Sequence, residues 1–264
     1  MLELKNISKT FNAGTVNQKV ALNGLNLTMN EGDFVTVIGG NGAGKSTMLN
    51  AIAGVFPVDT GKILIDGVDV TALPEYKRAK YIGRVFQDPM MGTAATMQIE
   101  ENLALAARRG KPRTLRLGIT KADRAFYREQ LQILDLGLEE RMTTKVGLLS
   151  GGQRQALTLL MATLVTPKLL LLDEHTAALD PATAEKVLAL TKKIVAENHI
   201  TCLMITHNIP SALSLGNRTI MMNNGRIVLE LAGAERENMT TEQLLKVFHE
   251  QGVSSDRILF SAES

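Results

Sequence analysis

The feature that most constrains this chain is a glycine-rich octapeptide that follows a short apolar segment. Residues 39–46 read Gly-Gly-Asn-Gly-Ala-Gly-Lys-Ser and fit the pattern G-x-x-x-x-G-K-[ST]. The residues before it, 34–38, are nearly all apolar or β-branched, as in a strand buried on both faces, and residues 45–53 are expected to form a helix. Glycine permits positive φ angles and lets backbone N–H groups approach phosphate oxygens, and a helix N-terminus adds its positive dipole. We therefore predict a phosphate-binding loop rather than an ordinary glycine-rich turn.

Each side chain of this loop has an expected task. Lys45 should reach the β- and γ-phosphates of a nucleoside triphosphate, and the Ser46 hydroxyl should bind Mg²⁺. The sequence therefore predicts ATP and Mg²⁺ as ligands. The expected nucleotide-binding residues of the loop are Gly39, Gly40, Asn41, Gly42, Ala43, Gly44, Lys45, Ser46 and Thr47.

A second apolar strand ends in two acids. Residues 169–172 are four leucines, followed by Asp173 and Glu174. In open α/β sheets, ligands bind beyond the carboxyl ends of the strands, which is where these acids should lie. Asp173 is expected to hold Mg²⁺, and Glu174 to act as general base on the attacking water. The alternative, a solvated acid pair that caps a helix, is disfavoured because the preceding run is too hydrophobic for a surface loop.

The rest of the chain alternates strands with helices, which predicts an α/β fold with a mainly parallel central sheet. Apolar and polar residues alternate over residues 2–30, which favours antiparallel strands with one buried face. Residues 89–165 are expected to be mostly helical. Further predicted elements are a strand-turn-strand at 61–70, helices at 181–197, 210–215 and 240–251, a strand at 201–206 and a hairpin over 219–229.

Composition limits the function classes. The chain has 264 residues and a formal net charge of +2, which does not indicate a general nucleic-acid binder. The lone cysteine, Cys202, cannot form an internal disulfide or a thiolate zinc site, and is expected to be a small core residue. We expect no signal peptide and no membrane span, so action at a membrane would need a partner.

A third motif leads to a family. Residues 149–153 read Leu-Ser-Gly-Gly-Gln and stand between the other two motifs. This combination resembles the ABC ATPase family over about the first 230 residues. The resemblance implies a P-loop NTPase fold of ABC type, with an N-terminal antiparallel β-subdomain. It also implies an ATPase domain at 1–235 with a helical subdomain inserted at about 89–165, and a C-terminal helix and tail at 236–264.

Other family positions also find matches. Gln87 resembles the Q-loop glutamine, a further catalytic residue and Mg²⁺ ligand, and His207 resembles the switch histidine. Residues 178–180, Ala-Leu-Asp, resemble the D-loop. Phe11 stands where an aromatic residue of the family stacks on adenine, although a lone aromatic residue beside a strand is otherwise a core residue. In the same way, a lone histidine such as His207 is usually structural.

The Leu-Ser-Gly-Gly-Gln segment has a clear use only in a dimer. Ser150, Gly151, Gly152 and Gln153 open a predicted helix, whose N-terminus attracts anions. In the family, this segment closes on the γ-phosphate that a second, head-to-tail copy holds. The resemblance therefore implies a homodimer with two buried ATP molecules and cooperative hydrolysis.

The sequence departs from the family pattern at three places that matter. Gly40 replaces a proline, which should be tolerated because backbone N–H groups bind the phosphates. His175 stands where a proline usually follows the glutamate, and we expect it to pack rather than to titrate. Ala177 replaces a D-loop serine, which removes a hydroxyl that commonly helps communication between subunits.

The resemblance also implies partners and a location. The expected partners are an integral-membrane permease and an extracytoplasmic substrate-binding protein, which places the chain on the cytoplasmic face of the cell membrane. The sequence of residues 171–181 resembles that of ATPase subunits of bacterial amino-acid importers, including importers of aromatic amino acids. The permease groove is expected around 87–97, and the basic stretch 108–128 is either a solvated helix face or a surface near anionic lipid.

Several rival functions share some of these motifs. An exporter or a non-transport ABC ATPase is the main alternative. DNA-repair and chromosome ATPases carry long heptad or zinc insertions, and translation factors carry two modules; neither feature is visible here. A nucleotide-gated scaffold without hydrolysis would lack Glu174 or His207, and both are present.

Overall fold

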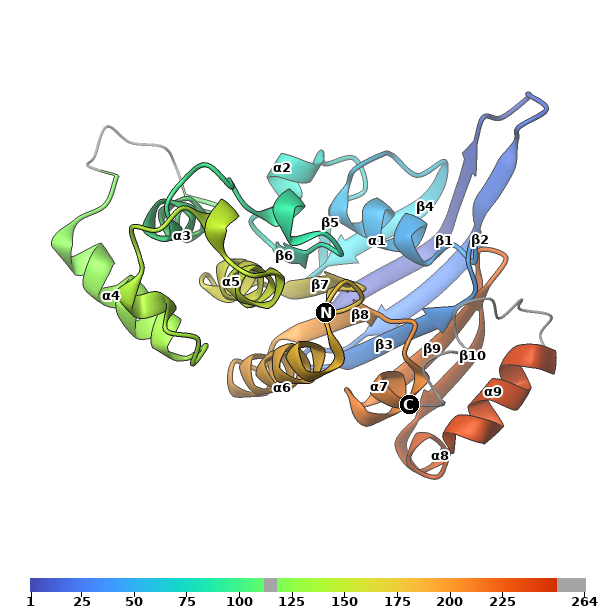
Figure 1. Cartoon of the computed structure of the whole chain (residues 1–264). Helices are drawn as coiled ribbons and strands as arrows, with labels where there is room; N and C mark the ends of the chain where they lie inside the picture. The colour runs from blue at the N-terminus through green and yellow to red at the C-terminus, as the bar shows by residue number, and fades with distance from the viewer. Residues whose placement is uncertain (112–117, 251–264) are drawn as a thin grey trace. The chain divides into compact units, whose positions relative to one another are not determined.

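The chain forms two compact units. The computed structural model describes residues 1–111 and 118–250. Unit 1 contains Met1–Arg78 and His199–Ser264, and unit 2 contains Ala79–Asn198 (Figure 1). Each unit has its own hydrophobic core and carries its own part of the predicted site.

Unit 1 carries an antiparallel sheet made from the N-terminal strands. Its strand order is β2-β1-β4-β5, and β1 pairs along most of its length with both β2 and β4. Inward-facing residues such as Leu4 and its partner Leu27 are almost fully buried, so the predicted one-sided burial is confirmed. The strands are β1 (Leu2–Phe11), β2 (Lys19–Met29), β4 (Thr60–Ile65) and β5 (Val68–Asp69).

A second set of strands in unit 1 surrounds β3 (Phe34–Gly39), whose six residues are all buried. β3 pairs in parallel with β8 (Thr201–Ile205) on one side and with β9 (Arg218–Asn223) on the other. β10 (Arg226–Ala232) pairs antiparallel with β9, so the predicted hairpin at 219–229 is confirmed. Burial on both faces explains why β3 is a continuous apolar run.

The helices of unit 1 cover these strands (Figure 1). Leu244 and Phe248 in the C-terminal helix are fully buried, and they belong to one hydrophobic cluster with Ile38 and Met221. The structure therefore groups this helix with unit 1, whereas the sequence predicted a separate segment from residue 236. The helices are α1 (Lys45–Ala53), α2 (Glu75–Arg78), α7 (Ile209–Ser214), α8 (Gly233–Glu237) and α9 (Thr241–Glu250).

Unit 2 is mostly helical around one short parallel strand pair. β6 (Ile82–Val85) pairs in parallel with β7 (Leu169–Asp173), in the register Val85 to Leu172. The helices include η1 (Pro89–Gly92), α3 (Ile99–Ala107), α4 (Lys121–Gln132), η2 (Leu138–Glu140), η3 (Val146–Leu148), α5 (Gly151–Thr163) and α6 (Pro181–Glu197). The start of α6 follows from its sequence, because Asp180 accepts a hydrogen bond from the Thr183 N–H and Pro181 fits the first helical position.

The basic stretch of unit 2 is largely engaged within the protein. The Arg109 guanidinium donates to the carbonyls of Ala162 and Val165, at the C-terminal end of α5. Arg124 forms an ion pair with Glu100 at 2.9 Å. Two of the eight basic residues, Arg113 and Arg116, lie outside the described residues. Arg109 and Arg124 therefore serve contacts within the protein.

The predicted α/β class is confirmed by the parallel pairs of both units. No helix within the described ranges is long and apolar enough to cross a membrane.

Candidate nucleotide-binding site

The phosphate loop has backbone geometry that only glycine accommodates. Gly39, Gly42 and Gly44 have φ angles of 153°, 78° and 102°. A Cβ atom on Gly39 would lie 2.4 Å from the Met222 carbonyl oxygen, and one on Gly44 would lie 2.6 Å from the Ala21 carbonyl oxygen. The glycines are therefore required by the close approach of neighbouring strands as well as by the turns they make.

Lys45 lies inside the loop that it terminates. Its side chain is buried, and Nζ donates hydrogen bonds to the carbonyl oxygens of Gly39 at 2.7 Å and Gly40 at 3.0 Å. α1 begins at Lys45 with Gly44 as N-cap and without a side-chain cap hydrogen bond. The first-turn N–H groups of α1 thus receive no side-chain cap from the Gly44 position, and the Lys45 ammonium lies against the carbonyls of the loop. This donor set fits a polyphosphate.

His207 follows the strand next to the loop. Val37 of β3 is in register with Ile205 of β8, and the Thr206 N–H donates to the Val37 carbonyl oxygen at 3.1 Å. Because β3 and β8 are parallel, the loop after β3 and His207 after β8 leave the sheet at the same edge. Unit 1 therefore brings together the phosphate loop and the predicted switch histidine.

Phe11 ends β1 and packs against a second aromatic ring. Its ring meets that of Phe56 edge-on, with centroids 5.2 Å apart. Lys9 Nζ lies 5.6 Å from the Phe11 centroid. Phe11 is partly exposed, so one part of the ring remains accessible. The arrangement is compatible with both predicted roles, adenine stacking and local packing.

The predicted carboxylates end β7 in unit 2. Asp173 is the last residue of the strand, and its Oδ2 lies 3.9 Å from Nη2 of Arg84 on β6. Glu174 follows with a φ angle of 45°, which is rare for a residue with a side chain. Gln87 lies two residues beyond the end of β6 and is exposed. Because β6 and β7 are parallel, Gln87 and the two acids follow adjacent strand ends.

The signature segment, residues 149–153, opens helix α5. Ser150 is the N-cap; its hydroxyl accepts from the Gln153 N–H, and the Gln153 side chain accepts from the Ser150 N–H, both at 3.2 Å. A Cβ on Gly152 would lie only 2.2 Å from Cγ2 of Thr183, in the first turn of α6. The helix starts of α5 and α6 are thus in direct contact, and this contact requires glycine at 152.

The family model of the ABC transporter matches residues 22–177. The match covers more than half of the chain and contains the phosphate loop, the signature segment and the carboxylate strand. This chain belongs to the ABC transporter ATPase family. It has the P-loop fold of that family, and it is an ATP-binding ATPase.

Curated relatives and solved structures agree with the family. A tyrosine transport ATP-binding protein of Clostridioides difficile is 44% identical over 94% of this chain and 98% of its own length. A methionine import ATP-binding protein of Corynebacterium efficiens is 35% identical over 86% of this chain, which spans 61% of that protein. The cassette MJ0796, solved as a dimer bound to ADP and phosphate, superposes with a TM-score of 0.74 at 33% identity, over 88% of this chain and 98% of its own.

The predicted ABC residues divide between the two units. Unit 1 holds Phe11, residues 39–47 and His207, and unit 2 holds Gln87, residues 150–153, and Asp173 with Glu174. Sequence reasoning missed Arg84, which faces Asp173, and Lys19, whose Nζ would lie 3.4 Å from a Cβ on Gly42. Neither residue belongs to a motif, so spacing alone gave no signal; the three-dimensional contacts reveal both.

The chemistry of the predicted magnesium ligands suits the ion. No group of three or more His, Cys, Asp or Glu that could hold a metal is found among the described residues. Mg²⁺ does not need such a cluster, because it prefers oxygen ligands, such as the hydroxyl, amide and carboxylate predicted here, and shares its shell with substrate phosphates and water.

Proposed function

We propose that this chain energises the import of an amino acid by hydrolysing ATP, held between the phosphate loop of one copy and the signature segment of another. The phosphate loop carries the nucleotide part of this proposal. Its left-handed glycines and the buried Lys45 ammonium form a ready anion site at the start of α1. The remaining parts rest on the placement of the other motifs and on the relatives.

The residues of unit 1 would bind and align the nucleotide. Loop N–H groups would bind the phosphates, and Lys45 would exchange its loop carbonyls for phosphate oxygens. Phe11 would stack on adenine with the exposed part of its ring. His207 would contact the γ-phosphate, since it follows the strand beside the loop.

The residues of unit 2 would hold the metal and prepare the water. Bound Mg²⁺ neutralises phosphate charge; Ser46, Gln87 and Asp173 would supply its protein oxygens. Glu174 would accept a proton from the attacking water, and Gln87 would orient that water from the adjacent strand end. The left-handed backbone of Glu174 turns the chain sharply directly after β7, where these groups are needed.

A second copy of the chain would complete each site. Ser150 and the N–H groups that follow it open α5, so they offer hydrogen-bond donors and the positive end of a helix dipole. The cassette MJ0796, solved as a dimer bound to ADP and phosphate, supports this arrangement. Ser150→Arg should abolish turnover and leave ATP binding nearly intact; loss of binding would contradict the assignment.

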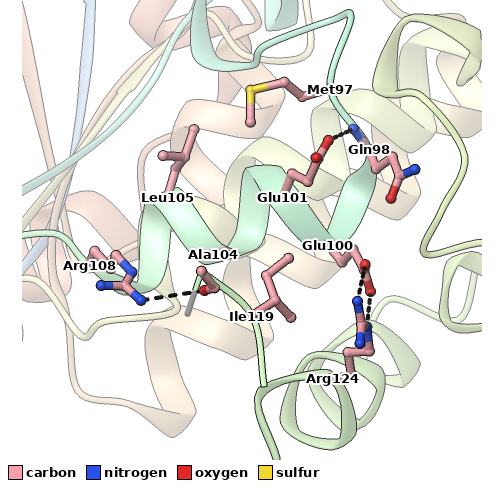
Figure 2. A pocket seen from close by; sticks show the side chains of 10 residues that line it. Met97, Gln98, Glu100, Glu101, Ala104, Leu105, Arg108, Ile119 and Arg124 are labelled. Carbon is pink, nitrogen blue, oxygen red and sulfur yellow. Dashed lines mark hydrogen bonds and ion pairs between the residues drawn. The ribbon is translucent and has the colours of Figure 1, made fainter. Parts of the chain in front are cut away.

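A membrane permease is the proposed partner, and unit 2 offers a pocket for it. The pocket has a volume of about 510 Å³ and lies along α3 (Figure 2). Its lining combines apolar Met97 and Leu105 with the charged Glu101 and Arg108, a mixture suited to a short amphipathic helix. Of the residues that line this pocket, Met97 alone falls within the permease groove predicted at residues 87–97. A cytoplasmic helix of the permease is the proposed occupant.

A pair of exposed apolar residues allows a matched test of this pocket. Leu105 lines it and is 57% exposed, whereas Phe126 on α4 is 43% exposed and lies outside its lining. Leu105→Asp should prevent co-purification with a co-expressed permease, and Phe126→Asp should not. Equal behaviour of the two variants would contradict the docking site.

The substrate class rests on the relatives alone. Proteins named for tyrosine transport and methionine import favour an amino acid, an importer rather than an exporter, and an extracytoplasmic binding protein as third component. The ATPase would then lie on the cytoplasmic face of the membrane. Vesicles that contain the permease and binding protein of neighbouring genes should accumulate labelled tyrosine only with internal ATP. Uptake by a vesicle with Glu174→Gln at wild-type rate would refute the proposal.

A further inference from the structure

The residue directly after Glu174 is a buried histidine. His175 is 2% exposed, and its Nε2 atom lies 3.1 Å from Oγ1 of Thr191 in the middle of α6. Thr191 is fully buried as well. A polar ring in such a place is costly unless it is hydrogen-bonded, so this contact matters for the position of the ring.

The direction of this hydrogen bond follows from the threonine. The Thr191 hydroxyl donates its single proton to the Val187 carbonyl oxygen at 2.8 Å. With that proton on the Val187 carbonyl, the Thr191 oxygen accepts from His175 in the tautomer that carries its proton on Nε2. Burial lowers the pKa of His175 to about 4, so the ring is neutral near pH 7. A directional chain thus runs from His175 through Thr191 to the backbone of α6.

The backbone before His175 is strained. Glu174 has a φ of 45°, a left-handed conformation that is unfavourable in a residue with a side chain. The Ala177 N–H donates to the Glu174 carbonyl oxygen at 2.9 Å, which closes a turn, and Asp180 then caps α6. The turn is therefore fixed to α6 at Asp180 and, through His175, at Thr191.

We propose that His175 is a positioning residue for ATP hydrolysis: its Nε2–H to Thr191 hydrogen bond fastens the Glu174 backbone to α6 and thereby sets the direction of the Glu174 carboxylate. This inference rests on the proposed role of Glu174 as general base. The proline that usually stands at position 175 in the family would stiffen the backbone directly. In this chain, the His175 side chain instead anchors the backbone to the neighbouring helix α6. The anchor also links the base to the helix that begins with the D-loop aspartate.

The test compares kcat and KM for ATP in full-length variants. His175→Leu and Thr191→Val each remove the hydrogen bond, and each should lower kcat about tenfold, with KM changed less than about twofold. His175→Gln keeps an N–H donor near the Nε2 position, and Thr191→Ser keeps the hydroxyl; both should stay within about threefold of wild-type kcat. The double variant His175→Leu/Thr191→Val should be no slower than either single variant, because one interaction is removed only once.

A matched control and a benchmark separate the possible failures. Thr158 on α5 is also buried and bonds back to its own helix, at the Gln155 carbonyl, so Thr158→Val should leave kcat unchanged. Glu174→Gln serves as the benchmark. If Glu174→Gln abolishes turnover while Thr191→Val and His175→Leu keep wild-type kcat, the positioning role of His175 is refuted, and the role of Glu174 as general base stands. If Glu174→Gln itself keeps turnover, the proposed function fails. An unrescued His175→Gln also overturns the inference.

Discussion

The second glycine of the signature segment offers a sharp test of packing, separate from phosphate binding. Gly152→Ala places a Cβ 2.2 Å from Cγ2 of Thr183, far inside van der Waals contact. The methyl of Thr183 belongs to a stiff, β-branched side chain, and the Thr183 backbone N–H donates to the Asp180 side chain, so the methyl cannot swing away freely. Overpacking of this kind costs about 1–3 kcal/mol. In a domain of this size, that lowers Tm by about 3–10 °C.

The neighbouring glycine provides the control. A Cβ on Gly151 would meet Leu179 Cδ2 at 3.5 Å, an ordinary contact, so Gly151→Ala should be neutral or stabilising by up to about 1 kcal/mol. Urea unfolding of the nucleotide-free protein measures both variants without any contribution from phosphate. Thr183→Ser removes the clashing methyl and should restore most of the stability of Gly152→Ala. Equal stability of Gly151→Ala and Gly152→Ala, or no rescue by Thr183→Ser, would refute the reasoning.

Three further outcomes follow from named contacts. Arg78→Met should lower the free energy of unfolding by about 2–4 kcal/mol, because the buried guanidinium donates to four backbone carbonyls, two of them at the end of α1; urea titration checks this. Phe11→Ala should raise the Kd for ATP about tenfold, from the lost stacking, with Tm nearly unchanged; fluorescence titration with an ATP analogue checks this. Burial raises the pKa of Asp33, but hydrogen bonds from Asn217, Asn30 and Arg218 outweigh it and hold the pKa below its usual 3.8. Stability from Asp33 is therefore present above pH 3.8 and lost below it, and Asp33→Asn should flatten the acid limb of a urea-midpoint profile.

The sequence predicted the parts of the fold whose causes are local. The strand before the phosphate loop, the hairpin at residues 223–225 and the first turn of α6 each depend on a few adjacent residues. The phosphate loop was likewise predictable, because glycine spacing and the lysine are consecutive. Their conformations in the structure match those expectations.

Contacts between distant segments could not be predicted in this way. The sequence offered a solvated helix face or a lipid-facing surface for the stretch that contains Arg109, yet Arg109 caps α5 more than fifty residues later in the chain. The partner of His175, Thr191, lies in no motif, and neither does Thr183, which explains the glycine at 152. Such pairs depend on how helices pack, and one sequence without tertiary structure carries no periodic signal for them.

The most direct test of the proposed composite site is the mass of the Glu174→Gln protein with bound nucleotide. Light scattering after gel filtration should give twice the chain mass with Mg²⁺ and ATP, and a single-chain mass with ADP. The double variant Glu174→Gln/Ser150→Arg should bind ATP but keep the single-chain mass, because the signature segment can no longer reach the partner's phosphate. A Glu174→Gln protein that binds ATP and stays a single chain, or a double variant that still doubles its mass, would contradict the account.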